Sequence, residues 1–527
     1  MSDSNRYDLS SKQPTFFGLT KDTALKGLFG GNAFISIIVL GLITLFLFKE
    51  GAGFFGQYRE SLTLYRKSGL EYVNLMRDEQ NAHASLTQFL NNIQSDRSTY
   101  YSEQGMAFSD VKKELSALDG FIYDFEDLGY ELESYVQEMN ELVMNARDAY
   151  QSNEDYKIFK ANLEREGRMD EAANVVIAPV DLATYVAQLR AGEDTFLALS
   201  QSLVSGAKEL ILTIPSVEGE AFQAELDRFK NVVGSFFYEV PSFEKRIREW
   251  DRSLEVGLME GVTSFIFGRE WITGSAIQDW YGVIPLLGGS LTVAGIAMFF
   301  AVPLGVGAAI YVNQVANPKE QAFIKPYIEF ISAIPSVVIG FFGIAIFGEF
   351  VRFLTNHESL SWISFFPISE RLNAFTAGAL LALMAIPTIF TLAEDALNNV
   401  PKAYKEASSA MGATRLQTIL RIMVPTALSG IISAVLLGFG RVIGETMVVL
   451  LCAGNRIALP DFTKGLGAAF EPVHTMTGII AQELGEVEHG SIHYRALFMI
   501  GLTLFCLSLL INYVAQKIVI KYQISRG

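Results

Sequence analysis

Six long apolar segments constrain the fold of this 527-residue chain more than any other feature of its sequence. A helix rises about 1.5 Å per residue, so about 20 apolar residues are needed to cross the hydrocarbon core of a bilayer. The six segments lie near residues 28–48, 286–312, 327–348, 374–396, 427–453 and 496–520. The sequence therefore predicts an all-α polytopic membrane protein with six transmembrane helices. The first segment is too long for a signal-peptide core and lacks an A-x-A cleavage site, so we expect it to remain as an anchor.

Charge separates one region from the rest of the chain. Residues 49–282 hold 40 of the 57 acidic residues and 22 of the 41 basic residues, a net charge of −18, whereas the remaining residues have a net charge of +2. This difference indicates an acidic, water-soluble insert between the first two membrane helices. Apolar residues recur every three or four positions from Phe108 to Leu142, and similar patterns cover residues 58–94, 181–212 and 219–260. These patterns predict four long helices in an up-down bundle.

Lysine and arginine set the predicted orientation, because cytoplasmic loops of membrane proteins are enriched in them. They gather in the N-terminal tail, after the second segment, between the fourth and fifth segments, and in the C-terminal tail. In a six-span protein these four regions share one side of the membrane. We therefore expect a cytoplasmic tail at residues 1–27, a first transmembrane helix at 28–48, an extracytoplasmic helical insert at 49–282 and a membrane domain at 283–527, whose cytoplasmic loop covers 397–425.

A polar stretch between the fourth and fifth segments has the signals of two short helices. Pro401 suits the first turn of a helix, where a missing N–H costs nothing, and Gly412 suits the left-handed position after its end. Thr414 and Gln417 have the spacing of a capping box at the start of a second helix. We expect Pro425 to end that helix as the next apolar segment begins. The stretch therefore predicts a helix–turn–helix at the membrane surface.

Two charged residues lie inside the fifth apolar segment. Arg441 and Glu445 are four positions apart, which predicts that they share one face of a helix. A charge at bilayer depth costs about 3 kcal/mol, so such residues face a cavity or a partner. One interpretation is an Arg–Glu pair that only stabilises packing. The other is a polar transport path in which Arg441 binds an anion, since a guanidinium matches oxyanions well, and Glu445 orients or neutralises the site.

A short internal repeat lies in the third and fourth segments. Ala333-Ile334-Pro335-Ser336 and Ala385-Ile386-Pro387-Thr388 are similar and start 52 residues apart. A proline inside a span frees a backbone carbonyl, and a neighbouring hydroxyl can help to satisfy it. We expect kinked helices around the path, with Ser336 and Thr388 as candidate path residues. Kinks that serve packing alone are equally compatible with this pattern.

The polar loop resembles a known motif. Glu406-Ala407-Ser408, three residues, Gly412, nine residues and Ile422-x-Val424-Pro425 resemble the cytoplasmic coupling loop of ABC importer permeases, E-A-A-x3-G-x9-I-x-L-P. Ser408 and Val424 depart from that motif. The run from Gly440 to Met447 in turn resembles the G-R-x-x-G-E-T-M segment of the permease subunits of phosphate ABC importers, closer to the PstC type than to its PstA partner. The resemblance covers about residues 283–520 and the first anchor, whereas the insert departs from compact members.

The resemblance implies a six-helix ABC importer permease fold of the MetI-like type, in a bacterial cytoplasmic (inner) membrane. It implies a permease subunit for inorganic phosphate that is not itself an enzyme, and the sequence has no G-x-x-x-x-G-K-[ST] loop for ATP. Glu406, Ala407, Gly412 and Pro425 would belong to the site where a separate ATPase couples. The implied partners are a second permease subunit (PstA-like), an ABC ATPase dimer (PstB-like), an extracytoplasmic phosphate-binding protein (PstS-like) and the lipid bilayer. We expect no catalytic site, cofactor, metal or nucleic acid.

Two other functions remain open from the sequence. The first is a related permease for another oxyanion, sulfate or molybdate, although the segment around Arg441 favours phosphate. The second is a membrane sensor whose outer helical bundle transmits a ligand signal. A sensor of that kind would follow its bundle with one span and a long cytoplasmic region, whereas five apolar segments follow here. A combined role in transport and phosphate sensing is also compatible with the sequence.

Overall fold

The computed structural model describes residues 21–522, except residues 178–179, 216–218, 276, 358–359, 361–362, 364–365, 367 and 369. Its regular structure is almost entirely helical, and six helices are long and apolar enough to cross a membrane. These helices are Leu28–Ser68, Ile284–Val315, Ser336–Thr355, Ala374–Asn398, Arg415–Ile443 and Ile492–Ile520. The predicted all-α fold with six membrane helices is therefore confirmed.

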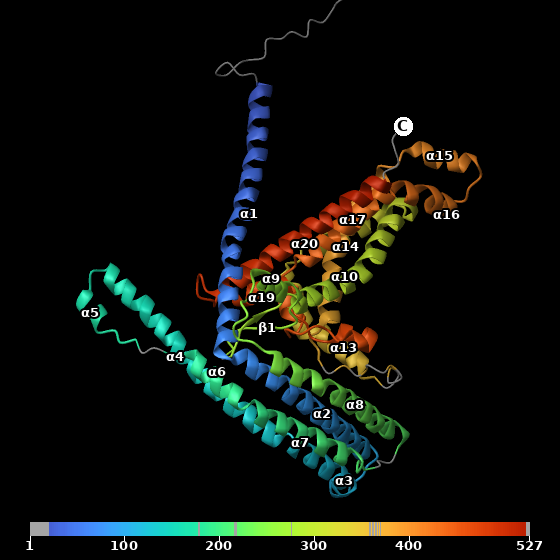
Figure 1. The fold of residues 1–527 in the computed structure, drawn as a ribbon. Coiled ribbons are helices and arrows are strands. Elements are labelled where there is room, and N and C mark those ends of the chain that lie inside the picture. The colour runs from blue at the N-terminus through green and yellow to red at the C-terminus, as the bar shows by residue number, and fades with distance from the viewer. Residues whose placement is uncertain are drawn as a thin grey trace, which may run out of the picture. The chain divides into compact units, whose positions relative to one another are not determined.

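The chain divides into two compact units, which are described separately (Figure 1). The membrane unit comprises Met1–Gln57, Val262–Gly274 and Asp279–Gly527. The insert unit comprises Tyr58–Gly261 and Ser275–Gln278. The long helix α1 (Lys21–Ser68) begins in the membrane unit and ends in the insert unit.

The membrane unit contains the helices of the second half of the chain and one short antiparallel ribbon. In the ribbon, β1 (Trp271–Ile272) pairs with β2 (Trp280–Tyr281), and Trp271 lies opposite Tyr281. The helical elements, some of which are single π-helical or 3₁₀ turns (η), are α10 (Ile284–Ile310), η1 (Tyr311–Val315), α11 (Pro318–Ser332), α12 (Ser336–Phe342), η2 (Gly343–Phe347), α13 (Gly348–Thr355), α14 (Ala374–Asn398), α15 (Lys402–Ala410), α16 (Arg415–Thr418), η4 (Ile419–Met423), α17 (Val424–Ile443), α18 (Met447–Cys452), η5 (Phe462–Phe470), α19 (Met476–Glu483) and α20 (Ile492–Tyr522).

Small side chains lie where α10 and α14 pack together in the membrane unit. Ala297 and Ala301 of α10 and Ala377 of α14 are fully buried where these two helices pack together. A Cβ atom on Gly378 would lie 2.7 Å from the side chain of Ile296. In lipid, helices associate by close packing, and small residues let their backbones approach. The fold of this unit therefore depends on residues that leave little space between helices.

The third membrane helix differs from its prediction. A helix over residues 327–348 with a kink near Pro335 was expected, but the chain is broken there: α11 ends at Ser332 and α12 begins only at Ser336. Between them, Pro335 has an extended backbone with ψ 137°. Proline has no N–H to continue a helix and disfavours helical geometry in the residue before it. The apolar helix that can cross the membrane is consequently Ser336–Thr355.

The fifth membrane helix also differs from its prediction, at both ends. It was expected over residues 427–453, after a helix ended by Pro425. Instead α16, η4 and α17 form one continuous helix from Arg415 to Ile443, with Pro425 in the first turn of α17. The π turn η4 changes the hydrogen-bond pattern just before the proline, so the missing N–H is tolerated without a break. At the other end, α17 stops at Ile443, and α18 is a separate short helix.

The insert unit is a bundle of long helices. Its helix α2 (Leu70–Glu103) packs against α3 (Phe108–Asp127), α4 (Tyr130–Arg165) and α8 (Glu220–Glu249). The shorter helices are α5 (Met169–Ala173), α6 (Leu182–Ala191), α7 (Glu193–Ile211) and α9 (Leu258–Phe267), of which α9 continues into the membrane unit. Large aromatic side chains fill the core, including Tyr72, Phe125 and Phe229, each fully buried. The predicted helical bundle is present, although its helices are divided differently.

Two glycines divide helices that were predicted to be continuous. The predicted helix from residue 58 is interrupted at Gly69, whose φ of +88° is unfavourable for any residue with a Cβ atom. The helix predicted from Phe108 to Leu142 is divided at Gly129, where a Cβ atom would lie 2.5 Å from Nδ1 of His83. Helix α4 then continues to Arg165. The apolar periodicity identified the buried faces but gave no signal for these joints.

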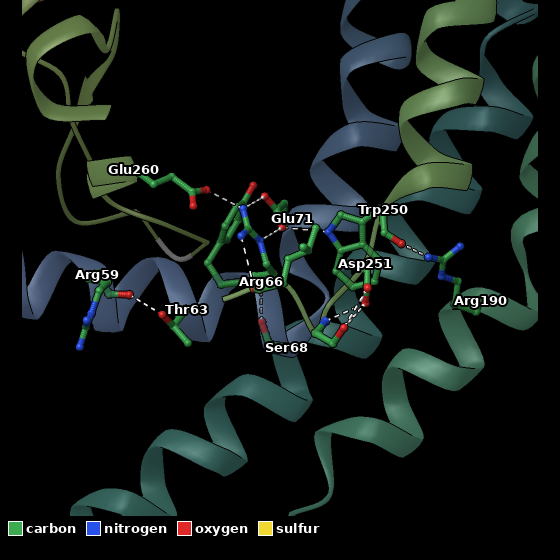
Figure 2. Close-up of polar contacts among 12 residues, drawn as sticks. Arg59, Thr63, Arg66, Ser68, Glu71, Arg190, Trp250, Asp251 and Glu260 are labelled. Atoms are coloured by element: carbon green, nitrogen blue, oxygen red, sulfur yellow. Dashed lines mark hydrogen bonds and ion pairs between the residues drawn. The ribbon is translucent and has the colours of Figure 1, made fainter. Parts of the chain in front are cut away.

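A polar network surrounds the Gly69 joint within the insert unit (Figure 2). The guanidinium of Arg66 donates to both carboxylate oxygens of Glu71, at 2.7 and 3.0 Å, and to Glu260 at 2.6 Å. The indole Nε1 of Trp250 donates to Glu71 at 2.8 Å, and Arg190 donates to the carbonyl of Trp250. These contacts connect the end of α1 and the start of α2 with the end of α8 and the start of α9. The network therefore holds together the helix ends through which the chain enters and leaves the bundle.

Candidate functional site

The polar loop has the local geometry that its sequence predicts. Pro401 directly precedes α15, and Gly412 follows its end with φ +77°. The N–H of Gly412 donates to the carbonyl of Ser409 at 3.0 Å, which satisfies a free carbonyl of the last turn. Thr414 and Gln417 form the predicted capping box: the N–H of Gln417 donates to Oγ1 of Thr414 at 3.3 Å, and the N–H of Thr414 donates to Oε1 of Gln417 at 2.9 Å. The predicted helix–turn–helix is therefore present, although its second helix continues past Pro425 to Ile443.

The outer surface of this loop is free in the described chain. No residue of α15 is buried, and Glu406, Ala407, Gly412 and Pro425 are all exposed. Met411, with 87% of its surface exposed, and Leu416, with 64%, add apolar area that the motif did not indicate. A loop that combines rigid caps with exposed apolar side chains has the properties of a docking surface for another protein.

The structure brings together two of the predicted path residues from different helices. Nη1 of Arg441 on α17 donates a hydrogen bond of 2.8 Å to Oγ1 of Thr388 on α14. Thr388 directly follows Pro387 in the middle of α14. Arg441 is exposed in the described chain. The pair therefore presents a cation and a hydroxyl on the surface of the membrane unit.

The prediction that Arg441 and Glu445 share one helix face is wrong, and the alternative of a packing Arg–Glu pair is not seen either. Helix α17 ends at Ile443, so the two residues do not share a helix face, and no ion pair joins them. The carboxylate of Glu445 instead accepts the N–H of Met447 at 3.3 Å, and its carbonyl accepts the hydroxyl of Thr477 at 2.7 Å. These bonds satisfy backbone groups at the break between α17 and α18. Glu445 therefore organises the chain next to Arg441, and among the residues that the structure describes no carboxylate pairs with the guanidinium.

Ser336, the remaining candidate path residue, is not hydrogen-bonded to Arg441 or Thr388. It is the first residue of α12, directly after the break at Pro335. Its role in a path stays a prediction.

Three buried hydroxyl residues near Glu445 were not predicted. The hydroxyl of Ser290 on α10 accepts the N–H of Met476 at 2.9 Å, and Thr475 caps α19 by accepting the N–H of Gly478 at 3.1 Å. Both hydroxyls, together with Thr477, line a small cavity that Glu445 also reaches. The run His474-Thr475-Met476-Thr477 is a polar interruption between apolar stretches, and it was the signal in the sequence that could have located this cluster.

Comparison with known proteins places this unit in a family. Residues 301–520 match the family described as "Binding-protein-dependent transport system inner membrane component". The "Probable ABC transporter permease protein YqgH" of Bacillus subtilis is 34% identical over 273 residues, which cover 50% of this chain and 82% of that protein. The "Phosphate transport system permease protein PstC" of Haemophilus influenzae is 32% identical over 288 residues, which cover 52% of this chain and 88% of that protein.

A solved structure of the MetNI methionine ABC transporter in inward-facing conformations also matches, with 21% identity and a TM-score of 0.33, over 46% of this chain and 94% of that chain. The matched family segment includes the polar loop, Thr388 and Arg441, whereas the insert unit lies outside it. Members of this family are multi-pass inner-membrane permeases that work with a substrate-binding protein and leave ATP hydrolysis to a separate subunit. The chain belongs to the family of binding-protein-dependent transport system inner membrane components, as a PstC-like permease subunit of an ABC transporter.

Proposed function

We propose that this permease subunit carries inorganic phosphate, and that Arg441 and Thr388 bind the ion as it crosses. The observation that carries the proposal is the hydrogen bond of 2.8 Å from Arg441 to the neutral hydroxyl of Thr388. No carboxylate of the described residues lies within 4.0 Å of this guanidinium. A positive charge at membrane depth is costly without a counterion. An anion bound to Arg441 would supply that counterion.

The chemistry of the pair suits a tetrahedral oxyanion. A guanidinium can donate to two oxygens of the ion at once, and the hydroxyl of Thr388, which accepts from Arg441, keeps its own proton to donate. Glu445 follows Arg441 in sequence just beyond the end of α17, and we propose that it faces the ion as an acceptor. Phosphate at neutral pH carries a proton that a carboxylate can accept as a hydrogen bond, whereas sulfate does not. The name of the Haemophilus influenzae relative supports phosphate over other oxyanions.

The same proposal assigns partners and orientation. A PstB-like ATPase dimer would bind the polar loop, residues 401–424, through the exposed surface at Glu406, Ala407 and Gly412. A PstA-like second permease subunit would complete the path beside Arg441, and a PstS-like binding protein would deliver phosphate from outside. Both termini and the loop would be cytoplasmic, and the insert, residues 49–282, extracytoplasmic. This orientation is supported by the distribution of lysine and arginine.

Uptake by the purified complex in proteoliposomes tests this function. The complex carrying Arg441→Ala should lose phosphate uptake by about 10- to 150-fold, because a charge-assisted contact to an oxyanion contributes about 1.5–3 kcal/mol. Arg441→Lys should retain part of the uptake, since the charge stays while the fork of donors is lost. Normal uptake by Arg441→Ala, in a complex that still binds its ATPase, would contradict the proposed path. Equal competition by sulfate or molybdate in the wild type would instead assign the permease to another oxyanion.

A further inference from the structure

We propose that six polar residues at the ends of the membrane helices form a clamp that couples the polar loop to Thr388. The end clamp consists of Asn313, Gln314, Lys325, Glu394, Asn398 and Arg415. The proposal rests on the proposed function, in which an ATPase acts on the loop, and it adds the route by which that action reaches the ion path. None of the six residues belongs to the motifs that identified the loop or the path.

Arg415 begins the route. This first residue of α16 donates from Nε at 3.1 Å and from Nη2 at 2.6 Å to the carbonyl of Gln314, and from Nη2 at 3.2 Å to the carbonyl of Val315. Both carbonyls lie in η1, the turn that ends α10, where carbonyls lack partners in the helix and carry partial negative charge. A bond of 2.8 Å between the hydroxyls of Ser408 and Thr418 joins α15 to α16. The loop is therefore attached to the end of α10.

A directional chain of side-chain amides continues from α10 to α14. Nε2 of Gln314 donates to Asn313 at 2.5 Å, Nδ2 of Asn313 donates to Asn398 at 2.6 Å, and Nδ2 of Asn398 donates to the carboxylate of Glu394 at 3.0 Å. Asn313 and Asn398 each accept one bond through Oδ1 and donate the next through Nδ2, so the chain runs in one direction from Gln314 to the carboxylate of Glu394. Such chains strengthen when every member is satisfied.

Lys325 closes the clamp from a third helix. Its Nζ lies 2.7 Å from Oε1 of Glu394, and Glu394 is 8% exposed. Removing one partner of such a pair leaves an uncompensated charge, so the two residues fix α11 against α14. Neither residue is needed to form the caps of the loop. The ion pair therefore holds α11 and α14 together without using any residue of the polar loop.

Two routes now lead from the loop to the two residues of the ion path. Along the first, α16, η4 and α17 are one helix from Arg415 to Arg441. Along the second, the end clamp reaches Glu394 on α14, six positions beyond Thr388, or about 9 Å along the helix axis. A loop displaced by an ATPase would move α17 directly and α14 through the clamp. The clamp would thus keep Arg441 and Thr388 together while the helices move.

Transport per ATP hydrolysed, measured with the complete complex in proteoliposomes, is the first test. Glu394→Gln should lower phosphate transported per ATP at least fivefold, while the ATPase still co-purifies, because the outer surface of α15 is unchanged. The exchange Lys325→Glu with Glu394→Lys should recover much of the ratio, since it restores the ion pair. Asp395→Asn is the matched control, because Asp395 is the exposed neighbour of Glu394. An unchanged ratio in Glu394→Gln, or loss of the ATPase together with transport, would overturn the clamp as a coupling route.

A distance measurement tests the clamp without relying on phosphate as the substrate. Spin labels would be placed at the exposed residues Leu383 on α14 and Leu420 on η4, after Cys506 is replaced by serine. In the wild type, this distance should be the same in nucleotide-free and ATP-trapped complexes. In Glu394→Gln, it should differ between the two states by about 3 Å or more, which is the rise of two helical residues. A wild-type distance that changes equally would contradict the clamp, even if the substrate proved to be phosphate. A constant distance with no phosphate uptake would instead retain the clamp and reject phosphate as the substrate.

Discussion

The two units of this protein are both helical, but their long helices pack through different kinds of residue. In the membrane unit, α10 and α14 meet at small buried residues such as Ala297 and Ala377, and Phe299 on α10 is exposed, although rings such as Phe390 are buried elsewhere in the unit. In the insert unit the core consists of large rings such as Phe125 and Phe229, whose centroids lie 5.5 Å apart. Water drives large apolar groups inward, whereas lipid does not, so helices in lipid are held by close packing of small residues. The contact between α10 and α14 therefore has the composition expected of helices that pack in lipid.

The largest effect that would test this comparison is the loss of a ring in the insert unit. Phe125→Ala should lower the free energy of unfolding of the insert by about 3–5 kcal/mol, because it removes buried area and leaves a cavity. Hydrogen exchange should speed up in peptides of α2, α3 and α8. Phe299→Ala, which removes the same ring from an exposed position of the membrane unit, is the matched control and should change exchange little. Similar effects of the two substitutions would remove the distinction between the cores.

A buried carboxyl in the insert unit should make its stability depend on pH. Burial raises the pKa of Glu79 to about 7, while Ser200 donates to its carboxyl at 2.5 Å. Because the folded insert then binds this proton more tightly than the unfolded chain does, its stability falls as pH rises from about 4.5 to 7, by up to about 3 kcal/mol. His83, whose pKa burial lowers, acts in the opposite sense as pH falls below about 6.5.

Glu79→Gln keeps an acceptor for Ser200 and removes the charge, so it should abolish the part of the pH dependence above pH 5. Hydrogen exchange of α2 at pH 5 and pH 7.5, corrected for intrinsic rates, measures this difference. The exposed residue Glu131 provides a control substitution, Glu131→Gln, which should leave the dependence unchanged. A dependence that survives in Glu79→Gln would assign it to another group.

A smaller effect is expected from one added methyl group in the membrane unit. Gly378→Ala would place its Cβ atom 2.7 Å from Ile296, and overpacking of this kind costs about 1–3 kcal/mol. The melting temperature of the detergent-solubilised complex should fall. Gly307→Ala on α10, where nothing lies within 4 Å of the added atom, is the control and should be neutral. Equal melting temperatures of the two variants would show that α10 and α14 need no close approach.

Local signals in the sequence were the most reliable. The capping box of Thr414 and Gln417 and the left-handed Gly412 are correct because each depends on partners within four residues. The six apolar segments are correct because crossing a bilayer requires length and composition alone. The disturbance at Pro335 was expected as a kink, and the structure has a full break there, since proline and the residue before it resist helical geometry.

Predictions that needed tertiary information failed or were absent. Arg441 and Glu445 were expected to share a helix face, but the helix stops between them, and Arg441 bonds to Thr388, which lies 53 positions earlier. The end clamp likewise joins residues from Asn313 to Arg415 that have no common motif. Periodicity shows which face of a helix is buried, but it carries no information on which helix will be its neighbour.

The sequence by itself determined that this chain has six membrane helices, an acidic helical insert and a capped loop typical of ABC importer permeases, because composition, periodicity and capping act over a few residues. Only the tertiary structure decided that Arg441 meets Thr388, that Glu445 stabilises a helix break, and that Arg415 connects to Glu394 and Lys325. Those contacts depend on the crossing of α10, α14 and α17, which is set by the packing of small residues from distant parts of the chain.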